Sequence, residues 1–218
     1  MHLPAPVSLL IVANWDLTGT PRVFSRDDAT GAWTAASLAQ GCPMPGFLPQ
    51  GCSLGRHRDL VTGIDRVFAG ENPHGIFGGT YDPAVAGHIR WSAAPELEHS
   101  GVSEVGSSGR SGHPRVSSFA ECNGRFYAAV GQHIYERIDG ADPRWRLLYT
   151  DPNPGHSETG LRGLTAVPSP SGHGEVLLAA VEGNAARIVR VDPLTAARSP
   201  SSTSRIFSAN GGRCGLDM

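Results

Sequence analysis

Residues 125–150, RFYAAVGQHIYERIDGADPRWRLLYT, carry the pattern that decides the fold. An apolar strand is followed by a short polar loop and by a second strand that ends in Asp139. A turn and a strand with Trp145 come next. Side chains alternate between the two faces of a strand, and short polar turns join antiparallel neighbours. The stretch therefore predicts three consecutive antiparallel strands.

The same order recurs in residues 9–37, 66–94 and 175–209 of the 218-residue chain. The aspartates that end the second strand are separated by 54, 57 and 53 residues, and they are Asp28, Asp82, Asp139 and Asp192. A tryptophan follows in the first three copies, at Trp33, Trp91 and Trp145. In the fourth copy we expect Phe207 to take its place. A steady period of this kind indicates a repeat architecture.

A further strand is predicted ahead of three copies, at residues 60–64 (LVTGI), 116–122 and 161–167. The first copy has no room for one. Antiparallel units of four strands are typical of β-propeller blades. We therefore expect an all-β fold, a propeller-type array of about four antiparallel blades in a single domain. The predicted units are 1–40, 55–98, 115–150 and 161–210, and they form an incomplete ring or a fragment of a larger propeller.

Three copies carry Arg-x-Asp on the second strand, and the motif in residues 137–139 is typical. Copy two departs, with Gly79 or Thr80 near the arginine position. Residues i and i+2 share one face of a strand, so the arginine and the aspartate are predicted to lie side by side. The aspartate then begins a turn, where its carboxylate accepts backbone N–H groups. We interpret the motif as structural, because an active site is normally single.

The Asp-turn-Trp element resembles the Asp-box of sialidase-like propellers, which reads roughly Ser-x-Asp-x-Gly-x-x-Trp. The closest copy is residues 25–33, SRDDATGAW, in which the Gly and the Trp are offset from that pattern. The resemblance implies a propeller at the level of the superfamily and identifies no specific family.

Composition excludes several functions. The formal net charge of −2 argues against a nucleic-acid partner, which normally binds to a basic surface. It holds no lysine, so chemistry that needs a lysine amine is excluded. No apolar stretch reaches membrane-spanning length and no signal peptide is visible, so we expect no membrane partner and favour a cytoplasmic location. Cys42 and Cys52 bracket a loop, either as a disulfide or as two free thiols.

Polar residues gather in the loops between the apolar strand and the strand that ends in Asp. They are Asn14, Asp16, Glu71, Asn72, His74, His133, Glu182 and Asn184. If the blades are adjacent, these loops converge on one face. Carboxylate and amide oxygens suit calcium. The arrangement resembles that of calcium-dependent propeller lactonases, which implies Asp16, Glu71, Glu182 and Asn184 as metal ligands. The two histidines are alternatives as general bases.

The loop at residues 151–163 adds His156 and Arg162 as ligand-binding candidates. A loop arginine either clamps an anionic ligand or pairs with a nearby carboxylate. The sequence contains no GxSxG elbow, no HExxH motif and no phosphate loop.

These features favour a non-catalytic module that binds a small molecule, a glycan or a protein on one loop face. One alternative is a hydrolase or lactonase of propeller type that uses a loop-bound divalent cation. A second is a sialidase-like glycan-processing protein, which needs an arginine cluster, a tyrosine nucleophile and an acidic partner. The sequence leaves open whether the protein is an enzyme.

Overall fold

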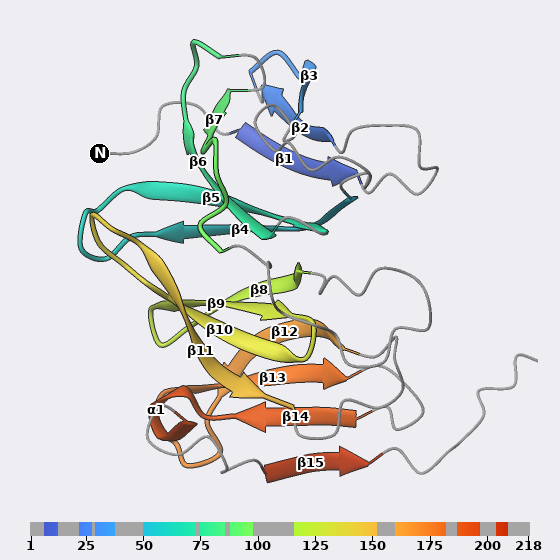
Figure 1. The fold of residues 1–218 in the computed structure, drawn as a ribbon, viewed down its shortest axis with the longest axis vertical. Coiled ribbons are helices and arrows are strands. Elements are labelled where there is room, and N and C mark those ends of the chain that lie inside the picture. The colour runs from blue at the N-terminus through green and yellow to red at the C-terminus, as the bar shows by residue number, and fades with distance from the viewer. Residues whose placement is uncertain are drawn as a thin grey trace, which may run out of the picture.

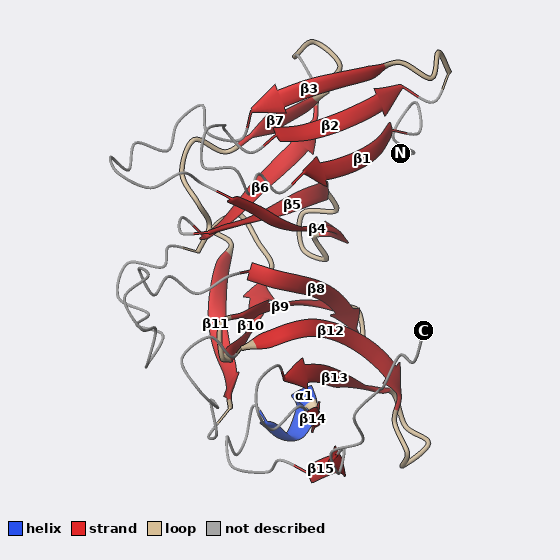
Figure 2. Ribbon diagram, turned by 90° about the vertical axis from the view of Figure 1, so that its right-hand side faces the viewer, coloured by secondary structure: helices blue, strands red, loops and turns tan. Residues whose placement is uncertain are grey.

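In a computed structural model, most of the described residues form strands in antiparallel sheets, with almost no helix. The described residues are 7–12, 22–27, 29–37, 50–72, 75–85, 88–97, 116–151, 160–181, 187–196 and 204–208. They form four sheets that follow one another in chain order along the long axis of the molecule (Figures 1 and 2). The predicted all-β class is confirmed.

Sheets 1 and 2 come from the N-terminal half of the chain. Sheet 1 has the strand order β1 (Val7–Val12), β2 (Arg22–Asp27) and β3 (Trp33–Ser37). Sheet 2 has the order β4 (Gln50–Arg58), β5 (Asp65–Asn72), β6 (Gly75–Tyr81) and β7 (Ile89–Trp91). Within the described residues sheet 1 has three strands.

Sheets 3 and 4 repeat the four-stranded order. Sheet 3 consists of β8 (Val116–Cys122), β9 (Arg125–Val130), β10 (His133–Ile138) and β11 (Arg144–Thr150). Sheet 4 consists of β12 (Leu161–Pro168), β13 (Glu175–Val181), β14 (Arg187–Val191) and β15 (Ser204–Ser208). The helix α1 (Pro193–Ala196) lies between the last two of these strands in sequence. The predicted leading strands β8 and β12 are confirmed.

The prediction that residues 60–64 form the leading strand of sheet 2 is wrong. They make the turn between β4 and β5, and β4 itself is the leading strand, so sheet 2 begins at residue 50 and not at 55. The Asp59 carboxylate accepts the backbone N–H groups of Val61 and Thr62 at 3.0 and 2.8 Å. Gly63 has a φ of 69°, a conformation that favours glycine, and it completes this turn.

The tryptophan positions are equivalent in three sheets. Each tryptophan lies on the last strand, where Trp33 pairs with Arg26, Trp91 with Gly79 and Trp145 with Arg137. In sheet 4 the residue opposite Arg190 is Ser204, whereas Phe207 pairs with Ile188, so the expected role of Phe207 is wrong.

Gly79 occupies the arginine position of sheet 2. A Cβ atom there would lie 2.9 Å from Cε3 of Trp91. The same Cβ would lie 2.6 Å from Cγ2 of Ile89, so the packing of Ile89 and Trp91 leaves no room for a side chain at this position.

Sheet 3 packs against sheet 2 with one face and against sheet 4 with the other. Phe126 and Ala128 of β9 belong to a cluster with Phe68 and Ile76 of sheet 2. The alternate residues, Tyr127 among them, belong to a second cluster with residues of sheet 4. Burial of apolar surface on both faces is the main source of stability in this part of the molecule.

The leading strands of neighbouring sheets contact each other through small residues. The Ser53 hydroxyl of β4 donates to the Val116 carbonyl at 2.7 Å, and the Ser117 hydroxyl of β8 donates to the Leu161 carbonyl at 2.5 Å. A Cβ atom at Gly70 of β5 would lie only 2.5 Å from Cβ of Val116. The approach of sheet 3 to sheet 2 thus requires glycine at this position.

We expect Gly70→Ala to lower the free energy of unfolding by about 1–3 kcal/mol, because the added methyl group overpacks the contact with Val116. Gly163→Ala on β12 is the matched control, since its Cβ would meet Ala180 at an ordinary 3.8 Å. Urea unfolding followed by tryptophan fluorescence measures both variants. Equal stabilities of the two variants would contradict the proposed steric limit.

Candidate functional site

The strands that precede the predicted polar loops run in the same direction. β1, β5, β9 and β13 all point to the right in Figure 1, so the chain leaves them on one side of the molecule, here called the loop side. Glu71 and Asn72 end β5, and His133 begins β10, so these candidates lie on the loop side.

Several predicted site residues lie outside the described residues: Asn14, Asp16, His74, His156, Glu182 and Asn184. The side chains of Glu71 and Asn72, and Cys42 with the side chain of Cys52, are outside them too. The calcium site and the disulfide therefore stay predictions. Among the described residues no group of three His, Cys, Asp or Glu side chains is arranged to hold a metal ion.

The leading strands β4, β8 and β12 each carry an irregularity at their loop-side end. The pairing register shifts between Gly51 and Ser53, between Val116 and Ser118, and between Leu161 and Gly163. The residues skipped by the ladder are Cys52, Ser117 and Arg162. Bulges of this kind redirect a side chain and are frequent beside binding sites. The predicted candidate Arg162 is thus the partly buried bulge residue of β12.

His133 is the loop-side candidate whose surroundings are defined. Its Nδ1 lies 2.9 Å from the Thr150 hydroxyl, and its ring meets the Tyr135 ring edge-on at 6.0 Å. Burial lowers the pKa of His133, so the ring is neutral near pH 7. A neutral imidazole oriented in this way can donate to or accept from a ligand.

A charged cluster lies at the opposite end of sheets 2 and 3. It consists of His57, Asp59, Glu96, Glu121, Arg137 and Asp139. The Arg137 guanidinium lies 3.1 Å from carboxylate oxygens of both Asp59 and Glu96, and it also pairs with Asp139. The side chains of Arg137 and Asp59 are fully buried. Arg137 and Asp139 therefore lie side by side, as Arg-x-Asp predicts.

Two turns are joined through this cluster. The Asp59 carboxylate accepts the N–H of Gly140, and the Asp139 carboxylate accepts the N–H of Leu60. Burial by itself raises the pKa of Asp59, but hydrogen bonds from the N–H groups of Thr62 and Gly140 and from Arg137 outweigh burial. The pKa is held well below its usual range, and Asp59 stays ionised.

His57 connects three strands within the cluster. Its Nδ1 lies 2.6 Å from Glu121 and its Nε2 lies 2.9 Å from Asp139, while its ring stacks on Phe126 at 5.0 Å. The side chain is only 2% exposed. A histidine enclosed in this way joins sheets 2 and 3 and offers no surface to a substrate.

The repeated aspartates behave differently in the other sheets. Asp82 and Asp192 each accept the N–H two residues on, from Ala84 and Leu194, both at 2.9 Å. These are the predicted local turns. Asp139 instead bonds to residues of sheet 2, which sequence reasoning missed.

The tyrosines lie on strands. Tyr127 of β9 is 1% exposed, beside Glu136. Burial, together with the negative charge of Glu136, raises its pKa well above the usual range. A buried, protonated phenol does not suit the nucleophile that the sialidase-like alternative requires.

Comparison with known protein families, with curated proteins and with solved structures finds no match for this chain. In the part of the chain that the structure describes, no helix has the length and apolar character of a membrane span.

We expect Arg137→Met to destabilise the protein by about 3–5 kcal/mol, because it leaves buried carboxylates without their cation. Arg56→Gln is the control, since Arg56 is exposed and its pair with Asp65 spans 3.3 Å at the surface. That control should cost no more than about 1 kcal/mol. Thermal and urea unfolding measure the difference, and similar losses for the two variants would show that the cluster contributes little.

The lowered pKa of Asp59 predicts that the protein loses stability in acid. Its folded pKa lies below its unfolded value, so its contribution is present above about pH 4 and is lost as the pH falls further. Asp59→Asn should therefore be less stable than the unchanged protein at neutral pH, and the gap should narrow toward about pH 2. Urea unfolding across this range measures the gap, and a constant gap would refute the assignment.

Proposed function

We propose that the protein is a non-catalytic binding module, built as an incomplete propeller-type array of four blades, whose ligand contacts the loop side. Sheets 2, 3 and 4 share the four-stranded order of blades, and their leading strands β4, β8 and β12 lie next to one another. Both features support a propeller-type arrangement.

The repeated bulge carries the proposal of a ligand face. Three leading strands are irregular at the same end, beside the last residues of β5, β9 and β13. Regular pairing is more stable than a bulge, so a bulge kept at equivalent positions is consistent with a functional role.

The groups available on this side suit a polar ligand. Arg162 supplies a cation and His133 an imidazole. The sequence predicts that Asn14, Asn72 and Asn184 add amides from the loops. Amide, imidazole and guanidinium groups bind hydroxyl, carbonyl and carboxylate groups, as a glycan, a polar small molecule or a protein loop presents them. The net charge of −2 makes a nucleic acid a poor partner.

The charged cluster supports a binding role more than a catalytic one. Arg137 and Asp59 pair with each other inside the molecule, and His57 is enclosed. The cation-dependent hydrolase remains the alternative, and it depends on Asp16, Glu71, Glu182 and Asn184 acting together.

A glycan array probed with labelled protein tests the proposal. We expect binding that is lost in a His133→Ala, Arg162→Gln double variant and kept in Arg56→Gln, whose side chain lies elsewhere on β4. Binding unaffected by the double variant would place the ligand away from the loop side.

Calcium separates the binding module from the hydrolase. We expect neither a shift of the melting temperature with millimolar calcium nor hydrolysis of simple lactones. A rise of several degrees that Glu182→Gln abolishes would favour the cation-dependent enzyme, because a ligand selective for the native state stabilises it.

A further inference from the structure

Three arginines share one face of sheet 3. Glu136 of β10 pairs with Tyr127 on one side and with Arg146 on the other, so these residues point the same way. Arg125 is two residues before Tyr127, and Arg144 is two residues before Arg146, which places both on that face. We call Arg125, Arg144, Arg146 and Glu136 the arginine cluster.

A buried carboxylate fixes two of these arginines. Nη1 of Arg125 and Nη2 of Arg146 each lie 2.5 Å from a different oxygen of Glu136. The Glu136 side chain is 3% exposed, whereas those of Arg125 and Arg146 are 53% and 51% exposed. Each guanidinium is therefore anchored at one nitrogen, while about half of each arginine side chain is exposed to solvent.

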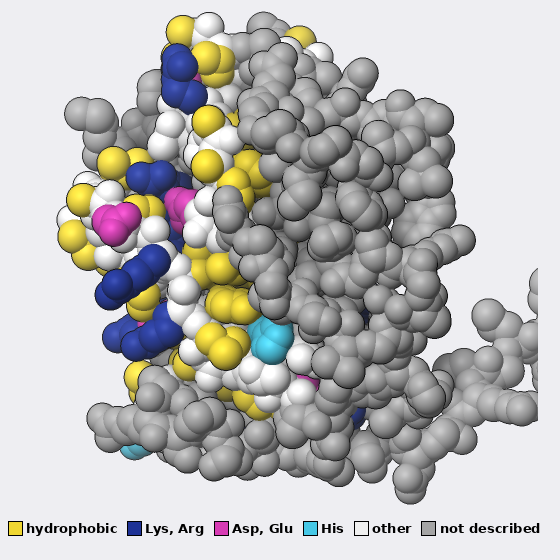
Figure 3. Space-filling view, in the orientation of Figure 1, with side chains coloured by type: hydrophobic (Ala, Val, Ile, Leu, Met, Phe, Trp, Pro, Cys, Tyr) yellow, Lys and Arg dark blue, Asp and Glu magenta, His cyan; other side chains and the backbone are white. Residues whose placement is uncertain are grey.

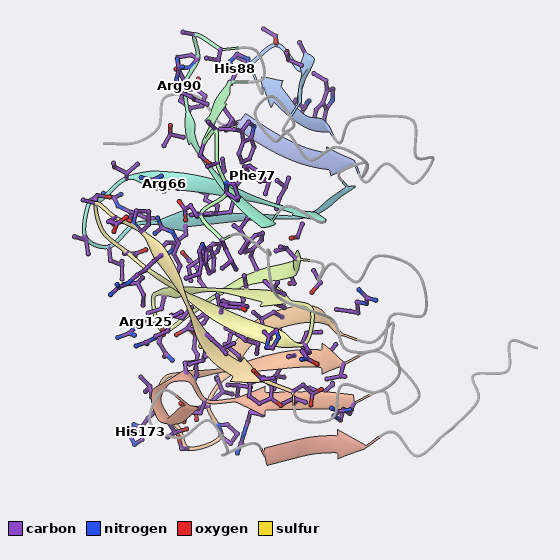
Figure 4. The ribbon with its side chains drawn as sticks, viewed as in Figure 1. Arg66, Phe77, His88, Arg90, Arg125 and His173 are labelled. Atoms are coloured by element: carbon purple, nitrogen blue, oxygen red, sulfur yellow. The ribbon has the colours of Figure 1, made fainter. Side chains whose placement is uncertain are left out.

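The third arginine, Arg144, adds a positive charge to the same face. Arg144 is exposed, and among the described residues it makes no ion pair. Tyr127, beneath the cluster, is kept neutral by burial, which raises its pKa. Three cations around one carboxylate leave an excess of positive charge. Figure 3 shows basic side chains along the left edge, and Figure 4 shows Arg125 there, directed away from the strands.

We propose that the arginine cluster binds a tetrahedral oxyanion, a phosphate or sulfate group. A guanidinium offers parallel N–H donors that match two oxygens of such a group. Because Glu136 holds two guanidinium groups in place, little side-chain entropy remains to be lost on binding. The site lies at the start of β9, away from the loop side, so it is independent of the ligand proposed above.

Isothermal titration with inorganic phosphate and with phenyl phosphate, at constant ionic strength, tests the site. We expect both to bind, with an affinity at least about tenfold lower in Arg146→Gln, because a charge-assisted donor pair is lost. Arg146→Lys should lose most of the affinity too, since lysine keeps the charge but not the paired donors. Arg56→Gln, an exposed arginine outside the cluster, should change the affinity less than about twofold.

Arg146→Gln removes one partner of the buried Glu136, and this variant could fail to fold. Arg144→Gln then serves as the second test of the site. Arg144 makes no ion pair with another described residue, so its variant should fold normally and still bind phosphate several-fold more weakly. Stronger binding of phenyl phosphate than of inorganic phosphate would identify an ester as the natural source, and equal binding would identify the free ion. Absence of binding at tens of millimolar, or equal losses in Arg144→Gln and Arg56→Gln, would overturn the proposal.

Discussion

The packing of sheet 2 against sheet 3 depends on one buried cation. Arg137 projects from β10 into the space between the sheets, and its guanidinium lies 5.1 Å from the centre of the Phe68 ring. A charge removed from water in this way is tolerated only with opposite charges in contact. They come from Asp59 after β4, Glu96 after β7 and Asp139 after β10. The sheets can therefore close fully only when these three segments meet, which makes the charged cluster a determinant of how they fit.

The strands with a local signal could be predicted from the sequence. Alternating apolar residues, the regularly spaced aspartates and the tryptophans locate the second, third and fourth strands of each unit. β4 could not be found in this way, because its sequence QGCSLGRHR is rich in glycine and charge. Each of its informative residues suits sheet 3: Ser53 bonds to Val116, Gly55 makes room for Phe119, and His57 reaches Glu121. When the residues of a strand are suited to contacts with another sheet, their sequence does not show the alternating pattern of a strand.

Part of the candidate site could also be predicted from the sequence, and part could not. The direction of β1, β5, β9 and β13 follows from the repeat, and with it the common side of the loops. The bulges at Ser117 and Arg162 have no signature in a single sequence, because an extra residue is visible only against its pairing partner. The charged cluster was missed because its contacts bridge 78 residues between Asp59 and Arg137, and 82 between His57 and Asp139.

The contacts between leading strands have a consequence for the history of the molecule. Among the described strands, the larger inter-sheet contacts join sheets that are neighbours in the chain. The serine-to-carbonyl bond recurs from β4 to β8 and from β8 to β12. In a linear array of this kind, sheet 3 contacts the preceding and the following sheet through the same kind of bond. A gene segment that encodes one sheet can therefore be duplicated or lost while the remaining interfaces keep their chemistry.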